Sequence, residues 1–199
     1  MIRKIDKNIY LDLEQDKKDE YFKKVGYFSG TFDPFHEGHL KVAQEVSKYL
    51  DEIWIQPHNF NPKKTPENLI HRIKIIELSI SNSPKCFLLH YPAHLSQNKY
   101  KLMTNLEEKI KGVIISDVIG SDHLQKTINY GINRDVYCVT RHDISQIKPI
   151  PRIFMIKSDP KSISASSANI REAIRVKHRH NLPLNEKVLA YIVQNQLYL

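Results

Sequence analysis

The sequence predicts one α/β domain with a mostly parallel, Rossmann-like sheet covered by helices on both faces. Short apolar runs alternate along the chain with polar stretches that have helical periodicity. The 199 residues, 41% of them hydrophobic, are enough for one substantial core. No internal repeat or linker marks a second domain within the helix-and-strand pattern. Ligands of such sheets bind at the carboxyl ends of the strands, where we therefore look for a site.

Six short apolar runs have the length and composition of buried strands. Cys86 and Cys138 lie beside or within these runs without paired spacing, which predicts buried free thiols rather than a disulfide or a metal site. In chain order, the six runs are residues 25–28, 53–55, 87–89, 113–119, 136–139 and 153–156.

Three polar stretches carry apolar residues at helical spacing, and we expect the apolar face of each helix to be buried. The inward residues are Val42, Val46, Tyr49 and Leu50 in stretch 37–50; Leu69, Ile73, Ile76 and Ile80 in stretch 66–81; and Val188, Leu189, Ile192 and Val193 in stretch 186–196.

The first 24 residues are a polar extension, which we expect to form a surface helix or to remain loose, before a domain at residues 25–199. The extension lacks the apolar core of a signal peptide, and no apolar segment approaches the roughly 20 residues of a membrane span. We therefore expect a cytoplasmic protein with no membrane partner. The net charge of +8 indicates an anionic partner, but nucleotides, nucleic acid and a membrane surface would all satisfy it.

The stretch "VGYFSGTFDPFHEGHLKVAQEV" (25–46) joins a predicted strand to a predicted helix through a tight turn. Gly30 lets the backbone approach a ligand, and the helix start offers N–H groups and a positive dipole end to a phosphate. His36 and His39 project from this end, where they can donate hydrogen bonds to a phosphoryl group as its charge develops. Two histidines at this spacing also fit zinc, but the nearest helix offers no third ligand, so we expect no metal site.

Two motifs give the chain a resemblance to a known family. "SGTFDPFHEGHL" resembles the (G/S)GxFDPxHxGH signature of the HxGH nucleotidyltransferase superfamily. "SISASSANIREAI" resembles its second motif, ISSTxIR, with Ser166, Ser167, Ile170 and Arg171 in register. From about residue 25 to the end, the chain is similar to the bacterial-type nicotinate (nicotinamide) mononucleotide adenylyltransferases. Four further stretches carry this similarity: "IQPHNFNPKK", "HRIKIIELSI", "VIGSDHLQKTINY" and "VLAYIVQNQLYL".

The resemblance implies transfer of AMP from ATP to nicotinate mononucleotide, or to nicotinamide mononucleotide, with release of pyrophosphate in NAD biosynthesis. It implies ATP and a pyridine mononucleotide as partners, and Mg²⁺ that accompanies ATP. The attacking phosphate oxygen is already anionic, so the protein has to position the reactants and stabilise charge. By the same resemblance the catalytic residues are His36, His39 and Arg171, and ATP is bound by these three together with Gly30, Thr31, Phe32, Asp122, Ser166 and Ser167.

For the acceptor nucleotide, the resemblance implies contacts from Lys64, Arg72, Tyr130 and Arg141. Lys63 is an equal candidate to Lys64, and Arg72 also fits an ordinary charge on a helix face. Tyr130 stands where the family often carries Trp near the pyridine ring. Ala168 stands where Thr is typical, which removes one hydroxyl from the pyrophosphate site. The side chains do not distinguish nicotinate from nicotinamide.

Several alternatives stay open beside this interpretation. Pantetheine-phosphate adenylyltransferase shares both motifs but usually has Thr in place of the first histidine, and a cytidylyltransferase has a second motif, RTEGIST, that this chain does not match. Outside the class, "REAIRVKHRH" could form the contact face of a basic nucleic-acid-binding module, but no aromatic platform accompanies it, and we expect no nucleic-acid partner. A catalytically weak descendant with a regulatory role, and a homo-oligomer, also remain open.

Overall fold

The computed structural model describes residues 22–59, 65–90, 98–140, 148–158 and 165–199, and the backbone of 2–5 and 8–11. Its strands are β1 (Ile2–Ile5), β2 (Asn8–Leu11), β3 (Lys23–Gly30), β4 (Glu52–Pro57), β5 (Cys86–His90), β6 (Val113–Gly120), β7 (Val136–Thr140) and β8 (Ile153–Lys157).

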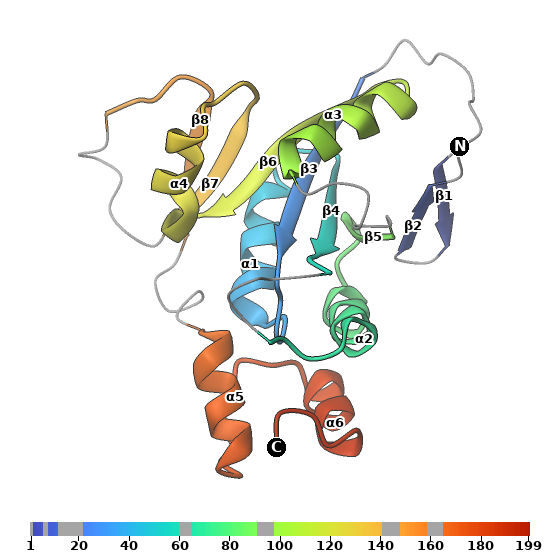
Figure 1. The fold of residues 1–199 in the computed structure, drawn as a ribbon, viewed down its shortest axis with the longest axis vertical. Coiled ribbons are helices and arrows are strands. Elements are labelled where there is room, and N and C mark those ends of the chain that lie inside the picture. The colour runs from blue at the N-terminus through green and yellow to red at the C-terminus, as the bar shows by residue number, and fades with distance from the viewer. Residues whose placement is uncertain are drawn as a thin grey trace.

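The strands form one sheet in the order β1-β2-β5-β4-β3-β6-β7-β8 (Figure 1). Neighbours from β2 to β8 pair in parallel. The chain winds outward from β3 in one direction to β5, and then from β6 in the other direction to β8. Ligands of doubly wound sheets bind where the direction of winding changes, which here is at the carboxyl ends of β3 and β6. The six predicted strands and the fold class are confirmed.

The N-terminal extension differs from the prediction of a surface helix or a loose segment. β1 and β2 pair antiparallel, and β2 joins the sheet parallel to β5, with Asn8 opposite Leu88. Isoleucine and tyrosine favour strands, and "IRKI" and "NIYL" contain enough of them to extend the sheet despite the polar composition of the segment as a whole.

Helices cover both faces of the sheet. On one face lie α1 (Glu37–Val46) and α2 (Leu69–Ile80), and Figure 1 shows α5 (Ser167–Arg175) and α6 (Glu186–Gln194) beyond the arrowheads of β3 and β4. On the other face α3 (Lys99–Lys109) packs over the centre of the sheet, and α4 (Leu124–Asn129) packs near β7 and β8. The first core includes Phe28, Val42, Ile76, Val118, Ile174 and Ile192, and the second includes Val25, Tyr27, Trp54, Leu102 and Leu106.

Most of the predicted inward residues are buried or partly buried, but two are not. Tyr49 is 58% exposed, because α1 ends at Val46 and the following turn takes Tyr49 out of the helical phase. Val193 is 39% exposed, because Ile192 beside it occupies the inward position of α6. The prediction was wrong for these two side chains. Cys86 and Cys138 are buried free thiols, as predicted.

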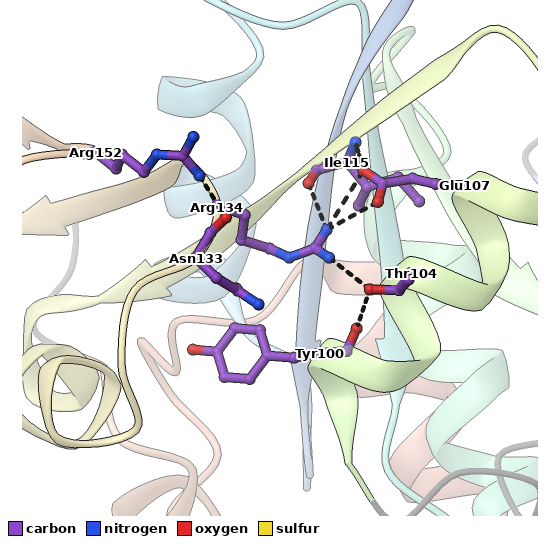
Figure 2. A network of polar contacts seen from close by, with 7 residues as sticks. All are labelled: Tyr100, Thr104, Glu107, Ile115, Asn133, Arg134 and Arg152. Atoms are coloured by element: carbon purple, nitrogen blue, oxygen red, sulfur yellow. Dashed lines mark hydrogen bonds and ion pairs between the residues drawn. The ribbon is translucent and has the colours of Figure 1, made fainter.

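A polar network holds α3 against β6 (Figure 2). Arg134 donates to the carbonyl of Ile115 at 2.9 Å and to Thr104 Oγ1 at 3.0 Å, and it lies 3.4 Å from both carboxylate oxygens of Glu107. Glu107 in turn accepts from the backbone N–H of Ile115 at 2.6 Å. Thr104 Oγ1 also donates to the Tyr100 carbonyl at 3.1 Å, within α3, so the network extends to the first turn of the helix.

In the part of the chain that the structure describes, no helix combines the length and apolarity needed to cross a membrane.

Candidate active site

The turn that carries the first motif lies at the carboxyl end of β3. Phe32 has a φ of 49°, and its ring centroid lies 5.0 Å from that of His39 and 5.1 Å from that of Phe35. A Cβ on Gly30 would lie 2.7 Å from the Phe32 ring. Gly30 therefore has a packing reason to be glycine, in addition to the close ligand approach that the sequence suggested.

His36 and His39 form a stacked pair at the first turn of α1. His36 is the N-cap residue, and the two ring centroids are 3.7 Å apart. The backbone N–H of His36 donates to His39 Nδ1 at 3.3 Å, so Nδ1 of His39 is an acceptor. A neutral imidazole with an acceptor at Nδ1 carries its proton at Nε2. This backbone contact therefore sets the tautomer of His39 and leaves Nε2–H as its donor.

Both rings are neutral at pH 7. Burial lowers the pKa of His36 to about 4. Burial also lowers the pKa of His39 well below its usual value, and the nearby His36 and His123 add to the effect. Nδ1 of His36 is buried and has no hydrogen-bond partner among the described residues. Such an atom is costly to leave unpaired, and a phosphate oxygen or a water molecule would supply the partner.

Gly38, between the two histidines, is required by the position of the first ring. A Cβ at Gly38 would lie 3.1 Å from both Cε1 and Nδ1 of His36, and 3.5 Å from the Cβ of Ala165. A larger residue would have to displace the imidazole. The glycine of this motif thus protects the geometry of His36.

The structure brings the second motif against the first. Ser166 is the N-cap of α5, and Ser167 Oγ donates to the carbonyl of Pro34 at 3.1 Å. Arg171 Nη1 donates to the carbonyl of Asp33 and lies 3.6 Å from Asp33 Oδ2. The Arg171 side chain is 33% exposed. Ser167 and Arg171 therefore have structural contacts in addition to the phosphate contacts that remain predicted for them.

Asp33 contacts both the segment before α2 and Arg171 of α5, and this role was not predicted from the sequence. Its Oδ1 accepts from the backbone N–H of Glu67 at 3.1 Å, in addition to its contacts with Arg171. Burial raises the pKa of the Tyr198 hydroxyl, and the negative charges of Asp33 and Glu67 add to this, so the C-terminal segment lies against the same turn. The position of Asp33 within the first motif was the feature of the sequence that could have indicated this role.

Arg72 connects three segments around the site through their backbones. Its side chain is buried, and Nη1 donates to the carbonyls of Thr31 at 2.7 Å and of His58 at 2.9 Å. Nε donates to the carbonyl of Glu67 at 2.8 Å. These carbonyls follow β3, follow β4 and precede α2. Arg72 is thus neither an exposed helix-face charge nor a side chain that reaches into solvent, and its contact with the acceptor stays a prediction.

The predicted residues on the β6 side are exposed. Asp122 lies in the short helix η2 (Ser121–His123) directly after β6, with its side chain 79% exposed and Oδ2 3.4 Å from His123 Nε2. Tyr130 ends α4 and is 69% exposed, with Lys126 Nζ 5.9 Å from its ring centroid. Lys63, Lys64 and Arg141 lie outside the described residues. Within the described ranges, no group of three or more His, Cys, Asp or Glu is placed to hold a metal ion.

The chain belongs to the family described as Cytidylyltransferase-like, whose model matches residues 27–173. It is 29% identical over 196 residues to the nicotinate-nucleotide adenylyltransferase of Bacillus subtilis (strain 168), an alignment that covers 88% of this chain and 98% of that protein. The structure is similar to Plasmodium falciparum nicotinic acid mononucleotide adenylyltransferase complexed with NaAD, with a TM-score of 0.73 and 20% identity over 88% of this chain and 97% of that one. The same Plasmodium protein complexed with APC gives a TM-score of 0.71 at 19% identity over the same shares. The resemblance inferred from the motifs is confirmed.

Proposed function

We propose that the protein transfers AMP from ATP to nicotinate mononucleotide, forming deamido-NAD and releasing pyrophosphate, in NAD biosynthesis. The observation that carries the proposal is the neutral His36–His39 pair at the carboxyl end of β3, with Arg171 held beside it through Asp33. The near full-length similarity to nicotinate-nucleotide adenylyltransferases supports this choice over other members of the family.

The arrangement suits stabilisation of a phosphoryl group. His39 Nε2–H and the ring of His36 donate to phosphate oxygens as negative charge builds up between the attacking and leaving groups. The start of α1 adds its positive dipole end. Arg171 and the Ser166 hydroxyl hold the pyrophosphate that leaves, and the backbone of Gly30, Thr31 and Phe32 lines the nucleotides.

The remaining assignments complete the two substrate sites. Asp122 accepts from a ribose hydroxyl of ATP. Tyr130 contacts the pyridine ring, and Lys64, Arg72 and Arg141 bind the acceptor. ATP would carry Mg²⁺, which phosphate oxygens and water would mainly hold, and the ion would supply charge neutralisation on the triphosphate.

An acceptor comparison tests the proposal. Purified protein is incubated with ATP and Mg²⁺ together with nicotinate mononucleotide, nicotinamide mononucleotide or phosphopantetheine, and pyrophosphate release is measured. We expect turnover with a pyridine mononucleotide, with the higher kcat/KM for the nicotinate form, and none with phosphopantetheine. Turnover with phosphopantetheine alone would replace the proposal by pantetheine-phosphate adenylyltransferase, and no turnover with any acceptor would leave a regulatory role.

A further inference from the structure

A buried carboxylate on β6 has no place in the chemistry described above. Asp117 is 0% exposed, and its Oδ2 lies 2.6 Å from Lys99 Nζ and 3.2 Å from the hydroxyl of Tyr100. Its Oδ1 is buried and has no hydrogen-bond partner in the described part of the chain. Burial raises the pKa of Asp117, and the charge of Lys99 opposes that rise. The carboxylate of Asp117 is thus buried inside the domain, and only one of its two oxygens has a partner among the described residues.

Stability does not explain this pair well. A buried ion pair contributes little to stability compared with apolar side chains of similar size, because both charges lose their hydration. The pair between Lys23 and Glu52, at the amino end of the sheet, is better satisfied: the two side chains are 2.9 Å apart, and Glu52 Oε2 also accepts from Trp54 Nε1 at 2.9 Å. Local features that work against stability tend to occur at functional sites.

Lys99 lies on the face of the sheet that α3 covers, where its partner Asp117 is opposite Tyr27, three residues before the carboxyl end of β3. Lys99 is the first residue of α3, directly after the connection from the carboxyl end of β5, and its side chain is 30% exposed. The carboxylate of Asp117 forms an ion pair with the ammonium group of Lys99, and the centroid of the Tyr100 ring lies 5.1 Å from Lys99 Nζ. The network of Figure 2 holds α3, which begins at Lys99, over β6 through Thr104 and Glu107. Lys99 is therefore pre-positioned rather than free to move with solvent.

His58 and His123 link Lys99 to the surroundings of the histidine pair through electrostatic effects. His58 follows β4, and its backbone N–H donates to the carbonyl of Gly30 at 2.8 Å. Burial lowers the pKa of His58, and the charges of Lys99, Arg72, His123 and Lys126 lower it further, so these groups are close enough to act on it electrostatically. His123 also acts on His39. Two carboxylates face this group: Asp122 Oδ2 lies 3.4 Å from His123 Nε2, and Asp117 Oδ2 lies 2.6 Å from Lys99 Nζ.

We propose that Lys99, positioned by Asp117, binds an anionic group of the acceptor mononucleotide, either its phosphate or its ring carboxylate. This inference rests on the proposed function. The acceptor must bring its phosphate to the ATP held at His36 and His39, and the remainder of the molecule then extends along the carboxyl edge of the sheet. Lys99, whose charge acts on His58 just beyond the carboxyl end of β4, supplies a charge-assisted hydrogen bond to it. Asp117 is a positioning residue, since it acts through Lys99.

The test uses variants that separate binding from stability. Lys99→Met alone would leave the Asp117 charge buried without a partner, so the main variant is the double substitution Lys99→Met/Asp117→Asn, which removes both charges at nearly constant shape. Lys99→Arg keeps the charge. The double substitution Lys23→Met/Glu52→Gln, which removes both charges of the ion pair at the other end of the sheet, is the matched control. KM and kcat are measured for ATP, nicotinate mononucleotide and nicotinamide mononucleotide, and the melting temperature is measured without ligand.

We expect the double variant to raise the acceptor KM by about 10-fold or more and to leave the KM of ATP and the melting temperature nearly unchanged. Lys99→Arg should retain part of the affinity, and Lys23→Met/Glu52→Gln should leave every KM unchanged. A rise for the nicotinate form alone assigns Lys99 to the carboxylate, and an equal rise for both acceptors assigns it to the phosphate. A lower melting temperature with unchanged acceptor KM overturns the inference. If the wild-type protein turns over neither pyridine mononucleotide, the proposed function fails first, and the inference fails with it.

Discussion

The two edges of the candidate site, after β3 and after β6, are built differently. The turn after β3 is tied to the rest of the domain by side chains that bind backbone carbonyls: Arg72 to Thr31, and Arg171 to Asp33. After β6, Asp122 and Tyr130 are exposed. The edge after β3 is therefore preorganised without substrate. The exposed side chains after β6 can still become ordered when substrate binds.

This difference matches the demands of phosphoryl transfer. Charge develops at the phosphorus that is attacked, and donors aimed there stabilise the transition state best when they need no reorganisation. Residues that only hold a substrate can acquire their contacts on binding. We therefore expect substitutions on the β3 edge to affect folding and kcat, and substitutions on the β6 edge to affect mainly the KM of the substrate that the residue holds.

The largest effect is expected for Arg72→Met, which removes the donors of three backbone carbonyls. Each buried acceptor left unpaired costs about 1–3 kcal/mol, so we expect the free energy of unfolding to fall by roughly 3 kcal/mol or more. Urea and thermal denaturation without ligand measure this. Lys74→Met, on the exposed face of the same helix, should change stability little. Normal stability combined with weaker acceptor binding would show that Arg72 serves the ligand alone.

His39→Ala should lower the rate of the chemical step. If the neutral imidazole donates to the phosphoryl group mainly in the transition state, kcat should fall by about 100-fold, while the KM of ATP changes modestly. Steady-state kinetics with ATP and nicotinate mononucleotide test this, with the exposed His178→Ala as control. A near-normal kcat would remove the histidine pair from the mechanism.

Arg171→Lys probes a residue with two roles. A lysine cannot offer the paired donors of a guanidinium to phosphate, so ATP and pyrophosphate should both bind about 10-fold more weakly. Because Arg171 also donates to the Asp33 carbonyl, we expect a loss of stability of about 1 kcal/mol or less. Calorimetric titration and thermal melting separate the two effects, and Arg175→Lys on the exposed face of α5 is the control. A lower melting temperature with unchanged ATP affinity would make the residue purely structural.

Tyr130→Ala should have the smallest effect. Loss of an aromatic stack costs about 0.5–1.5 kcal/mol, so the KM of the acceptor should rise by a few fold. Stability should not change, because the side chain is 69% exposed. Tyr49→Ala, a similarly exposed tyrosine at the end of α1, should leave KM unchanged. An unchanged acceptor KM for both variants would mean that Tyr130 lies outside the site.

The features predictable from the sequence are those encoded by residues near one another in the chain. The six apolar runs and the periodic stretches that became α1, α2 and α6 needed only local pattern. His36 and His39 share one turn of helix, so their juxtaposition followed from spacing. By contrast, α3 was missed because its buried residues, Leu102, Met103 and Leu106, stand among polar ones in a short segment.

The features that were not predictable depend on distant partners. Arg72 binds carbonyls 14 and 41 residues away, and Arg171 reaches Asp33, 138 residues away. In the sequence, Asp117 is a polar residue within an apolar run. Its ion pair with Lys99 could not be predicted, because only the fold brings the two side chains together. Periodicity assigns a residue to a face, but it does not say which backbone group that face will meet.

The pairing of β2 with β5 has a consequence for how the chain folds. The two strands of the N-terminal hairpin are close in sequence, but Asn8 meets Leu88 only after the chain between them has built the centre of the sheet. Non-local pairs close long loops, which slows their formation. We expect the hairpin to join the sheet last on refolding and its amides to lose protection first in hydrogen exchange. While the hairpin is docked, it covers the edge of β5, a row of backbone groups that could otherwise pair with another chain and start aggregation.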